Sequence, residues 1–247
     1  MNFKSREHLE TYLDNLKIIG MGSQGVCYYN PYDNSVYKIF HQFFDEDDDI
    51  EYHVTYEEKE ILRFSDVKNN TFIWPISVIR VKDEVVGYKT LYIKAKSLYQ
   101  CNPLNVNLDR LSSSIQTAKS DIDIISKERI LTYDMMYNIL YNDKFYIIDH
   151  DDYAYSDKDS LWIRKINYEN FGMELYYFLI DGLFQDFVNN SKILSELYKH
   201  KQEDVLIFLK ELRRSLSEMV DKGITTLGEA SKYCDQKVYR RKYQRGI

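Results

Sequence analysis

The spacing of apolar and polar positions divides the chain into a strand-rich first part and a mainly helical second part. Five runs in the first part have the composition of strands: 17–20, 26–30, 35–40, 72–81 and 85–93. Their β-branched and aromatic side chains pack well on a pleated sheet. Between them, the spacing of Glu58, Ile61 and Leu62 predicts one helix over Thr55 to Phe64.

Beyond residue 107 the apolar spacing becomes that of helices. One stripe of three- and four-residue steps predicts a long helix and consists of Leu108, Leu111, Ile115, Ala118, Ile122 and Ile125. Residues 168–183 are apolar nearly all round, which indicates a buried helix, and 205–220 form an amphipathic one. Asn142-Asp143 predicts the turn of a hairpin between 139–141 and 145–148. Thr226 and Glu229 have capping-box spacing and are expected to start the last helix.

The change of pattern indicates a boundary within the short polar stretch 94–105, which contains Pro103. We therefore expect an α+β fold with a small strand-rich unit at 1–94 and a larger helical unit at 95–247. The acidic run 45–51 is interpreted as a solvated connection rather than a metal site.

Composition narrows the class of protein. The chain is 44% hydrophobic and 29% charged, and its net charge of -6 argues against a dedicated nucleic-acid binder. No apolar run reaches the length of about 20 residues that a membrane span needs, and the first residues lack the apolar core of a signal peptide. Cys27, Cys101 and Cys234 are far apart, so we expect reduced thiols and a cytoplasmic location.

A glycine-rich turn is the first candidate for phosphate binding. Gly20, Gly22 and Gly25 fit G-x-G-x-x-G, in which glycines bring backbone amides close to phosphate oxygens. A dinucleotide-binding fold would start a helix at the third glycine. Here the β-prone residues Val26-Cys27-Tyr28-Tyr29 follow, so we expect a strand–turn–strand hairpin.

Three polar residues in the second part indicate phosphoryl transfer. Asp134 follows the long predicted helix and could accept a proton from a hydroxyl group, while Asn138 could bind Mg²⁺ through its carbonyl oxygen. Asp149 follows 11 residues after Asn138, at the end of an apolar run, where a carboxylate could bridge Mg²⁺ to nucleotide phosphates. An isolated Asp-Asn pair is more often a turn, but the second aspartate after a hairpin favours catalysis.

In this order, the glycine turn, Lys38, Glu58, the pair Asp134 and Asn138, and Asp149 resemble the protein kinase and kinase-like phosphotransferase superfamily. The resemblance implies a bilobal kinase-like fold, with a small β-rich N-lobe containing one helix and a larger helical C-lobe. It also implies that ATP and Mg²⁺ bind in the cleft between the lobes and that Asp134 is the base.

The resemblance assigns nucleotide contacts as well. Lys38 would hold the α- and β-phosphates, and Glu58 would orient it through an ion pair, with Glu57 and Glu60 as alternatives. The remaining positions are a hinge that offers backbone groups to adenine and the apolar walls around the base. The hinge would be Leu91, Tyr92 and Ile93, and the walls would be Ile19, Val26 and Ile148.

Several positions depart from the family pattern. Thr132-Tyr133 precedes Asp134 where kinases have His-Arg, so no arginine is present to receive an activating phosphate. The step from Asp134 to Asn138 is one residue shorter than usual, and Met136 replaces the lysine of protein-directed members.

The segment that follows Asp149 also differs. Asp149-His150-Asp151 stands where kinases have Asp-Phe-Gly, and we interpret His150 as a packing residue. The residues 167–172, Asn-Tyr-Glu-Asn-Phe-Gly, loosely match the start of the kinase central helix, D-x-W-S-x-G. The short interval between Asp149 and Asn167 indicates a reduced activation segment.

These features favour transfer of the ATP γ-phosphoryl group to a hydroxyl group, most simply of a serine or threonine in a protein. Two alternatives stay open: a small-molecule kinase of the aminoglycoside or choline kinase type, and a nucleotide-binding pseudokinase that acts as an interaction module. The C-terminal residues carry a basic cluster that is either a solvated helix end or a docking patch for an acidic partner or RNA. This cluster is Lys232, Lys237, Arg240, Arg241, Lys242 and Arg245.

Overall fold

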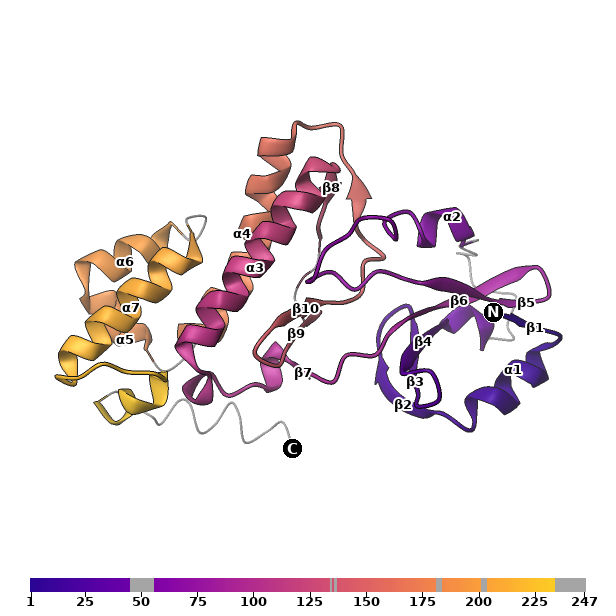
Figure 1. The fold of residues 1–247 in the computed structure, drawn as a ribbon, viewed down its shortest axis with the longest axis horizontal. Helices are drawn as coiled ribbons and strands as arrows, with labels where there is room; N and C mark the ends of the chain where they lie inside the picture. Colours follow the sequence, from indigo (N-terminus) through magenta and orange to yellow (C-terminus); the bar gives the residue numbers. More distant parts are fainter. Residues whose placement is uncertain (45–55, 134, 136, 181–183, 201–203, 234–247) are drawn as a thin grey trace. The chain divides into compact units, whose positions relative to one another are not determined.

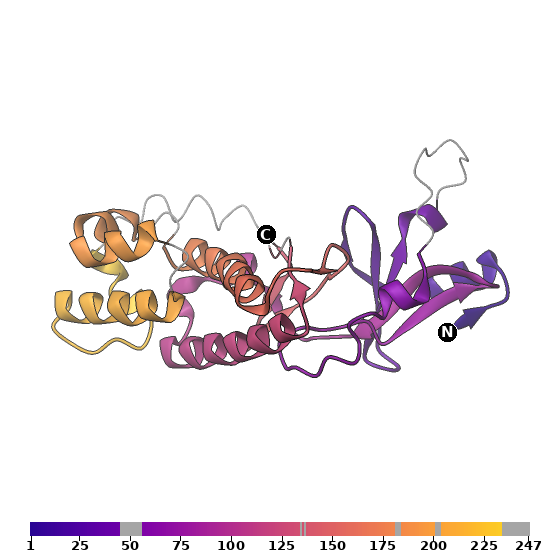
Figure 2. The ribbon, with the colours of Figure 1, turned by 90° about the horizontal axis from the view of Figure 1, so that it is seen from above.

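The chain forms two compact units (Figures 1 and 2). Unit 1 comprises Met1–Lys68 and Ile73–Lys94, and unit 2 comprises Asn69–Phe72 and Ala95–Ile247. The computed structural model describes residues 1–44, 56–133, 135, 137–180, 184–200 and 204–233. In this part of the chain the fold is α+β, with a six-stranded mixed sheet and seven α-helices.

A single sheet organises unit 1, and its strands run in the order β1-β5-β6-β4-β3-β2. All neighbouring strands are antiparallel except β1 and β5, which are parallel. The strands are β1 (Asn2–Phe3), β2 (Lys17–Met21), β3 (Gly25–Asn30), β4 (Ser35–Phe40), β5 (Ser77–Val81) and β6 (Glu84–Leu91). The strands predicted at 17–20, 26–30 and 35–40 are therefore confirmed.

The run 72–81 is a strand only in its second half. Before β5, the Trp74 indole donates a hydrogen bond to the carbonyl of Val67 and packs its ring on Phe64. Pro75 has no amide to donate to a ladder, and its own carbonyl accepts a hydrogen bond from Ser65. Side-chain contacts thus hold this stretch outside the sheet.

A helix that the apolar pattern did not predict covers one face of the sheet. Helix α1 (Arg6–Leu13) begins at Ser5, whose hydroxyl oxygen accepts a hydrogen bond from the His8 amide. Leu9 and Leu13, four residues apart, are both buried. They pack in a core with Phe3, Tyr37, Ile39, Ile79 and Val86. The expectation of one helix in the strand-rich part was therefore wrong.

The helix predicted over 55–64 is much shorter than expected. Helix α2 spans Glu58–Ile61, and the chain continues through turns to Asp66. The burial of Phe64 against Trp74 holds the chain in these turns and ends the helix. Just before α2, the Tyr56 ring stacks on Phe40, 3.9 Å between centroids. Because successive side chains of a strand point to opposite faces, this contact lies on the face away from α1.

Two long helices form the centre of unit 2, where they pack side by side (Figure 1). Helix α3 (Leu108–Lys127) agrees with the predicted stripe, whose apolar members are buried. Helix α4 (Ser160–Ile180) begins earlier than the predicted start at 168. Its first turn is stabilised by the Asp159 carboxylate, which accepts hydrogen bonds from the amides of Leu161 and Trp162.

The remaining helices of unit 2 follow in sequence. They are α5 (Gln185–Asn190), α6 (Lys192–Lys199) and α7 (Val205–Met219), and α7 is the amphipathic helix that was predicted. The capping box of Thr226 and Glu229 is present, but it starts a 3₁₀ turn (Leu227–Glu229) rather than an α-helix. In the part of the chain that the structure describes, unit 2 has further 3₁₀ turns at Leu98–Gln100, Pro103–Asn105 and Ser231–Tyr233, and unit 1 has one at His41–Phe43. The acidic run 45–51 and the basic cluster beyond Lys232 lie outside the described residues.

Two small sheets complete unit 2. The strands β7 (Lys96–Ser97), β9 (Ile139–Tyr141) and β10 (Phe145–Ile147) form one, and β8 (Ile130–Leu131) pairs with β11 (Ala154–Tyr155) in the other. The β9–β10 hairpin is confirmed, but Tyr141 pairs with Phe145, so its loop has three residues rather than two. Asp143, the second residue of this loop, has a left-handed backbone, φ 70°.

Asn69–Phe72 belongs to unit 2 because α3 holds it. Asp121, a buried carboxylate of α3, accepts hydrogen bonds from the Asn70 amide at 3.0 Å and the Thr71 hydroxyl at 2.6 Å. Phe72 forms an isolated bridge to Ile147 of β10. Among the described helices of either unit, none is long and apolar enough to cross a membrane.

We predict that α1 contributes to the stability of unit 1 through its buried leucines. Leu9→Ala should lower the free energy of unfolding by about 2–5 kcal/mol, because a cavity replaces a fully buried side chain. Thr11→Ala, on the exposed side of the same helix, should change it by less than about 0.5 kcal/mol. Urea denaturation of both variants measures the difference, and equal effects would show that α1 is not part of the core.

Candidate functional site

A buried asparagine fixes the backbone that leads to Asp134. Asn167 is fully buried in the interior of α4, and its side-chain oxygen accepts hydrogen bonds from the amide and the hydroxyl of Thr132, both at 2.9 Å. Its side-chain NH₂ group donates to the Ser126 hydroxyl at 3.0 Å and to the carbonyl of Ile130 at 2.9 Å. One side chain therefore connects α4 to the end of α3, to β8 and to the residue after β8.

A second asparagine completes this clamp from the same helix. Asn170 donates a side-chain hydrogen bond to the carbonyl of Thr132 at 2.8 Å, so both backbone groups of Thr132 are held by α4. Asn167 and Asn170 lie three residues apart and hence on one helix face. The loose motif match at 167–172 includes both residues, with Asn167 at the Asp position and Asn170 at the Ser position of D-x-W-S-x-G. Asp134 itself, like Met136, lies outside the described residues.

At the open end of the β9–β10 hairpin, Asn138 faces Ile148, and Asp149 is the next residue along the chain. Ile139 and Ile147 are paired across the hairpin, and the Ile148 amide donates to the carbonyl of Asn138 at 2.9 Å. The hairpin therefore brings together the two residues predicted to bind Mg²⁺. Asp149 itself has a left-handed backbone, with φ 62°. Asn138 directly follows another left-handed residue, Tyr137, with φ 68°. Such conformations are costly for residues other than glycine and cluster at functional sites.

The chemistry of this pair fits a magnesium ion shared with phosphates. Mg²⁺ prefers oxygen ligands and is usually held by one or two protein groups together with substrate phosphates and water. One carboxylate and one amide oxygen fit that pattern. The described residues contain no group of three or more histidine, cysteine or acidic side chains able to hold a metal by themselves.

His150 packs inside unit 2. It is buried, its Nε2 atom lies 3.0 Å from the carbonyl of Ile147, and its ring contacts the Tyr153 ring edge-on at 5.1 Å. The Phe72 ring lies 6.4 Å away. These contacts agree with the interpretation of His150 as a packing residue.

In unit 1, the glycine turn connects two antiparallel strands, as expected. Gly20 lies in β2, Gly25 begins β3, and the Gly22 amide donates to the Gly25 carbonyl at 3.0 Å. No helix follows the third glycine, so the dinucleotide-binding alternative is excluded for this turn. Gly25 is required because an added Cβ atom would lie 2.3 Å from the Ile39 carbonyl oxygen on β4.

Two side chains that were not predicted tie this turn to β4. The carbonyl of Gln24 accepts a hydrogen bond from the His41 amide at 3.0 Å, and His41 Nε2 lies 2.8 Å from the carbonyl of Gly22. Lys38 donates to the Gln24 side-chain oxygen at 3.1 Å. Nothing in the spacing of the sequence separates Gln24 and His41 from other polar residues, because their contacts arise only when β3 and β4 pair.

Lys38 is buried, not solvated. Only 5% of its surface is exposed, and its ammonium group lies 5.6 Å from the centre of the Tyr88 ring. Lysines are rarely buried at this level unless their charge has partners. The hydrogen bond to Gln24 and the contact with the Tyr88 ring are among the polar contacts of this buried ammonium group.

Glu58 has a different partner from the one expected. Its carboxylate pairs with the Arg80 guanidinium at 2.8 Å, and the same guanidinium donates to the carbonyl of Asp83. Glu57, one alternative, pairs with Lys59 at 2.7 Å. In this structure Glu58 therefore forms its ion pair with Arg80 and not with Lys38, the partner that was predicted.

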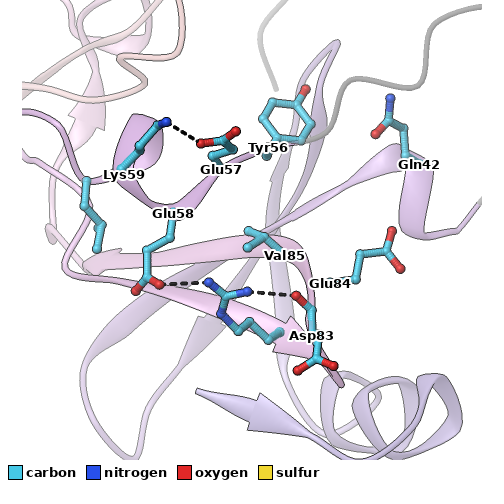
Figure 3. A pocket seen from close by; sticks show the side chains of 10 residues that line it. Gln42, Tyr56, Glu57, Glu58, Lys59, Asp83, Glu84 and Val85 are labelled. Carbon is cyan, nitrogen blue, oxygen red and sulfur yellow. Dashed lines mark hydrogen bonds and ion pairs between the residues drawn. The ribbon is translucent and has the colours of Figure 1, made fainter.

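Glu58 and Arg80 line an open pocket of about 680 Å³ beside α2 (Figure 3). The lining residues are Gln42, Tyr56, Glu57, Glu58, Lys59, Leu62, Arg80, Asp83, Glu84 and Val85. Most of its lining residues are polar or charged by type, and two ion pairs engage Glu57 and Glu58 (Figure 3). Neither Lys38 nor a residue of the glycine turn contributes to it.

Of the residues predicted to surround adenine, Ile148 belongs to unit 2 and the others belong to unit 1. In unit 1, Val26 is buried on β3 and Ile19 is half exposed in a β-bulge of β2. At the end of β6, the Tyr92 amide donates to the carbonyl of Asn34 and its ring packs on Tyr29, so this amide already has a partner. Leu91 is exposed, and Ile148 belongs to unit 2.

Neither Cys27 nor Cys101 takes part in a disulfide among the described residues, and Cys234 lies outside them. Comparison of the chain with models of protein families gave no match. Comparison with curated proteins gave no match either.

We predict that Asn167 is indispensable to the site. Asn167→Ala would leave four buried polar groups without their partner and should lower the free energy of unfolding by at least about 2 kcal/mol. Asn170→Ala removes the hydrogen bond to the Thr132 carbonyl and should cost roughly half as much or less. Urea denaturation compares the two variants, and a smaller effect at Asn167 than at Asn170 would contradict the clamp.

Proposed function

We propose that the chain is a kinase-like phosphotransferase that moves the γ-phosphoryl group of ATP to a hydroxyl group. In this proposal unit 1 is the N-lobe and unit 2 the C-lobe of a bilobal fold. The observation that carries it is the arrangement around Asn167. A buried polar clamp orients the backbone before Asp134, and a hairpin brings Asn138 and Asp149 together beyond it.

This arrangement supports phosphoryl transfer because the reaction depends mainly on positioning and charge. The proposal assigns Asp134 to accept the proton of the acceptor hydroxyl, and Asp149 and Asn138 to hold Mg²⁺. Bound Mg²⁺ would neutralise charge on the β- and γ-phosphates. Lys38 is assigned to the phosphates because it is a buried cation that touches the glycine turn through Gln24. Backbone amides of that turn would contact phosphate oxygens.

The acceptor that we propose first is a serine or threonine hydroxyl, as the likeness of the glycine turn and Lys38 to protein kinases implies. One observation favours a small-molecule acceptor as the second candidate. Helix α4 begins at Ser160, earlier than predicted, so only a short segment containing β11 separates it from Asp149. A short segment offers little platform for an extended peptide.

Removal of the proposed metal carboxylate tests the function. Asp149→Asn should reduce ATP turnover by at least about 100-fold, since a charge beside the metal is lost. Nucleotide binding should also lose its dependence on Mg²⁺. Asp152→Asn removes a nearby exposed carboxylate and should leave turnover unchanged. Turnover is measured as phosphate transfer to a mixed serine–threonine peptide library and as ADP release.

Two outcomes would contradict the proposal in different ways. Equal turnover in Asp149→Asn and the unchanged protein would exclude Asp149 as a metal ligand. If the protein binds nucleotide but shows no ATP turnover with any acceptor tested, the pseudokinase alternative is favoured instead.

We also predict activity without phosphorylation of the segment after Asp149. Tyr133 stands where kinases regulated in this way have an arginine that binds the phosphate. Ser156→Ala and Ser160→Ala should keep full turnover, and so should protein treated with phosphatase. A loss of activity that a phosphate at Ser156 restores would point to Arg129, whose guanidinium hydrogen-bonds the carbonyl of Asp157.

A further inference from the structure

A buried carboxyl group on α3 holds one short segment of the chain. Asp121 is 2% exposed and lies among the apolar side chains on the buried face of the helix. The Asn70 amide at 3.0 Å and the Thr71 hydroxyl at 2.6 Å both donate to its Oδ2 atom. Buried polar side chains are hydrogen-bonded as a rule, and here the partners all come from Asn69–Phe72. These hydrogen bonds fix the segment against α3.

The segment Asn69–Phe72 in turn binds the strand β10. The Ile147 amide donates to the Thr71 carbonyl at 2.7 Å, and Phe72 forms a parallel bridge to Ile147. Asn69 stabilises the segment itself, because its side-chain oxygen accepts hydrogen bonds from the amides of Thr71 and Phe72. Thr71 therefore links α3 to β10, with its hydroxyl group bound on one side and its carbonyl group on the other.

Ile147 lies two residues before Asp149, and the backbone between them is held by several contacts. The Ile147 amide is bound by the segment, and the next amide, that of Ile148, donates to the carbonyl of Asn138 at 2.9 Å. The Ile147 carbonyl lies 3.0 Å from Nε2 of the buried His150. The left-handed backbone of Asp149, φ 62°, is of a kind that persists only where the surroundings impose it. The contacts before and after this residue supply that constraint.

We propose that Asp121 is a positioning residue for Asp149 and that it acts through Thr71. The carboxyl group fixes Thr71, whose carbonyl fixes Ile147 and with it the backbone that presents the Asp149 side chain. Removal of a group that holds a metal ligand in place typically lowers metal affinity by about 10- to 100-fold. The role of Asp121 rests on the proposed function in one respect, because only that proposal makes Asp149 a ligand of Mg²⁺.

Binding of a non-hydrolysable ATP analogue, AMP-PNP, tests this role without turnover. Isothermal titration calorimetry measures its dissociation constant in Mg²⁺ and in EDTA, and the ratio of the two is the Mg²⁺ effect. Besides Asp121→Ala, the variants are Thr71→Val, which removes the hydroxyl group, and Thr71→Ser, which keeps it. The matched control is Asp123→Ala, because Asp123 lies on the same helix and its carboxylate is bound by Arg164 and Tyr168 of α4.

In the unchanged protein Mg²⁺ should tighten AMP-PNP binding by at least about tenfold, and in Asp121→Ala by less than about twofold. The Mg²⁺ effect of Thr71→Val should lie between these values. Thr71→Ser and Asp123→Ala should match the unchanged protein to within about twofold. The affinity in EDTA should be the same throughout, because Lys38 and the glycine turn belong to unit 1. A general loss of folding would lower the affinity in both conditions.

A full Mg²⁺ effect in Asp121→Ala would overturn the role of Asp121, and so would equal losses in Thr71→Ser and Thr71→Val. If Asp121→Ala does not fold, the two Thr71 variants decide, because Thr71→Val leaves the hydrogen bond from the Asn70 amide in place.

ATP turnover is measured alongside and separates this role from the proposed function. The expected Mg²⁺ effects without turnover, with any acceptor tested, would refute the proposed function but not the role of Asp121. Turnover together with a full Mg²⁺ effect in Asp121→Ala would refute only that role. Absence of AMP-PNP binding to the unchanged protein would refute both.

Discussion

The arrangement of unit 2 depends on the hydrogen bonds of one buried amide. An asparagine side chain can accept through its oxygen and donate through its nitrogen, and Asn167 uses both groups twice. Asn167 is fully buried, so each of these hydrogen bonds satisfies a polar group that would otherwise lack a partner. These hydrogen bonds fix the start of the loop after β8 against α3 and α4. The proposed chemistry requires reacting groups to be held in fixed positions.

In unit 1, close backbone contacts hold the strand β4 on both sides. This strand carries Lys38 and lies between β3 and β6, and a glycine faces it from each side. An added Cβ atom on Gly87 would lie 2.2 Å from the carbonyl oxygen of Lys38, and one on Gly25 would meet that of Ile39. Both neighbouring strands can approach closely only because these positions lack a side chain. The strand that buries a lysine is thus held on both sides by backbone contacts.

The ion pair of Glu58 shows how local charge can redirect an expected interaction. Arg80 lies on β5, and its planar guanidinium donates both to the Glu58 carboxylate and to the backbone carbonyl of Asp83. A lysine on β4 offers a single ammonium point charge, without this forked geometry. In the proposed phosphotransferase, the Gln24 side chain that accepts a hydrogen bond from Lys38 would help to orient this lysine, while Glu58 pairs with Arg80.

The sequence by itself determined the elements whose apolar spacing is regular or whose turns are chemically marked. These include α3, α7, the strands β2 to β4 and the β9–β10 hairpin, and with the hairpin came the proximity of Asn138 and Asp149. Helix α1 was missed because its signal is only two leucines after a capping serine, too short to stand out. Local spacing also could not give the length of α2, which the packing of Phe64 on Trp74 limits.

Only the tertiary structure decided which polar side chains are buried and what they bind. Lys38, Asn167 and Asp121 look like surface residues in a linear pattern, and each is covered once strands or helices pack around it. The same holds for the meeting of Asp121, Thr71 and Ile147, which come from three separate segments. Contacts between residues far apart in sequence depend on how whole elements pack, and spacing along the chain carries no direct record of that packing.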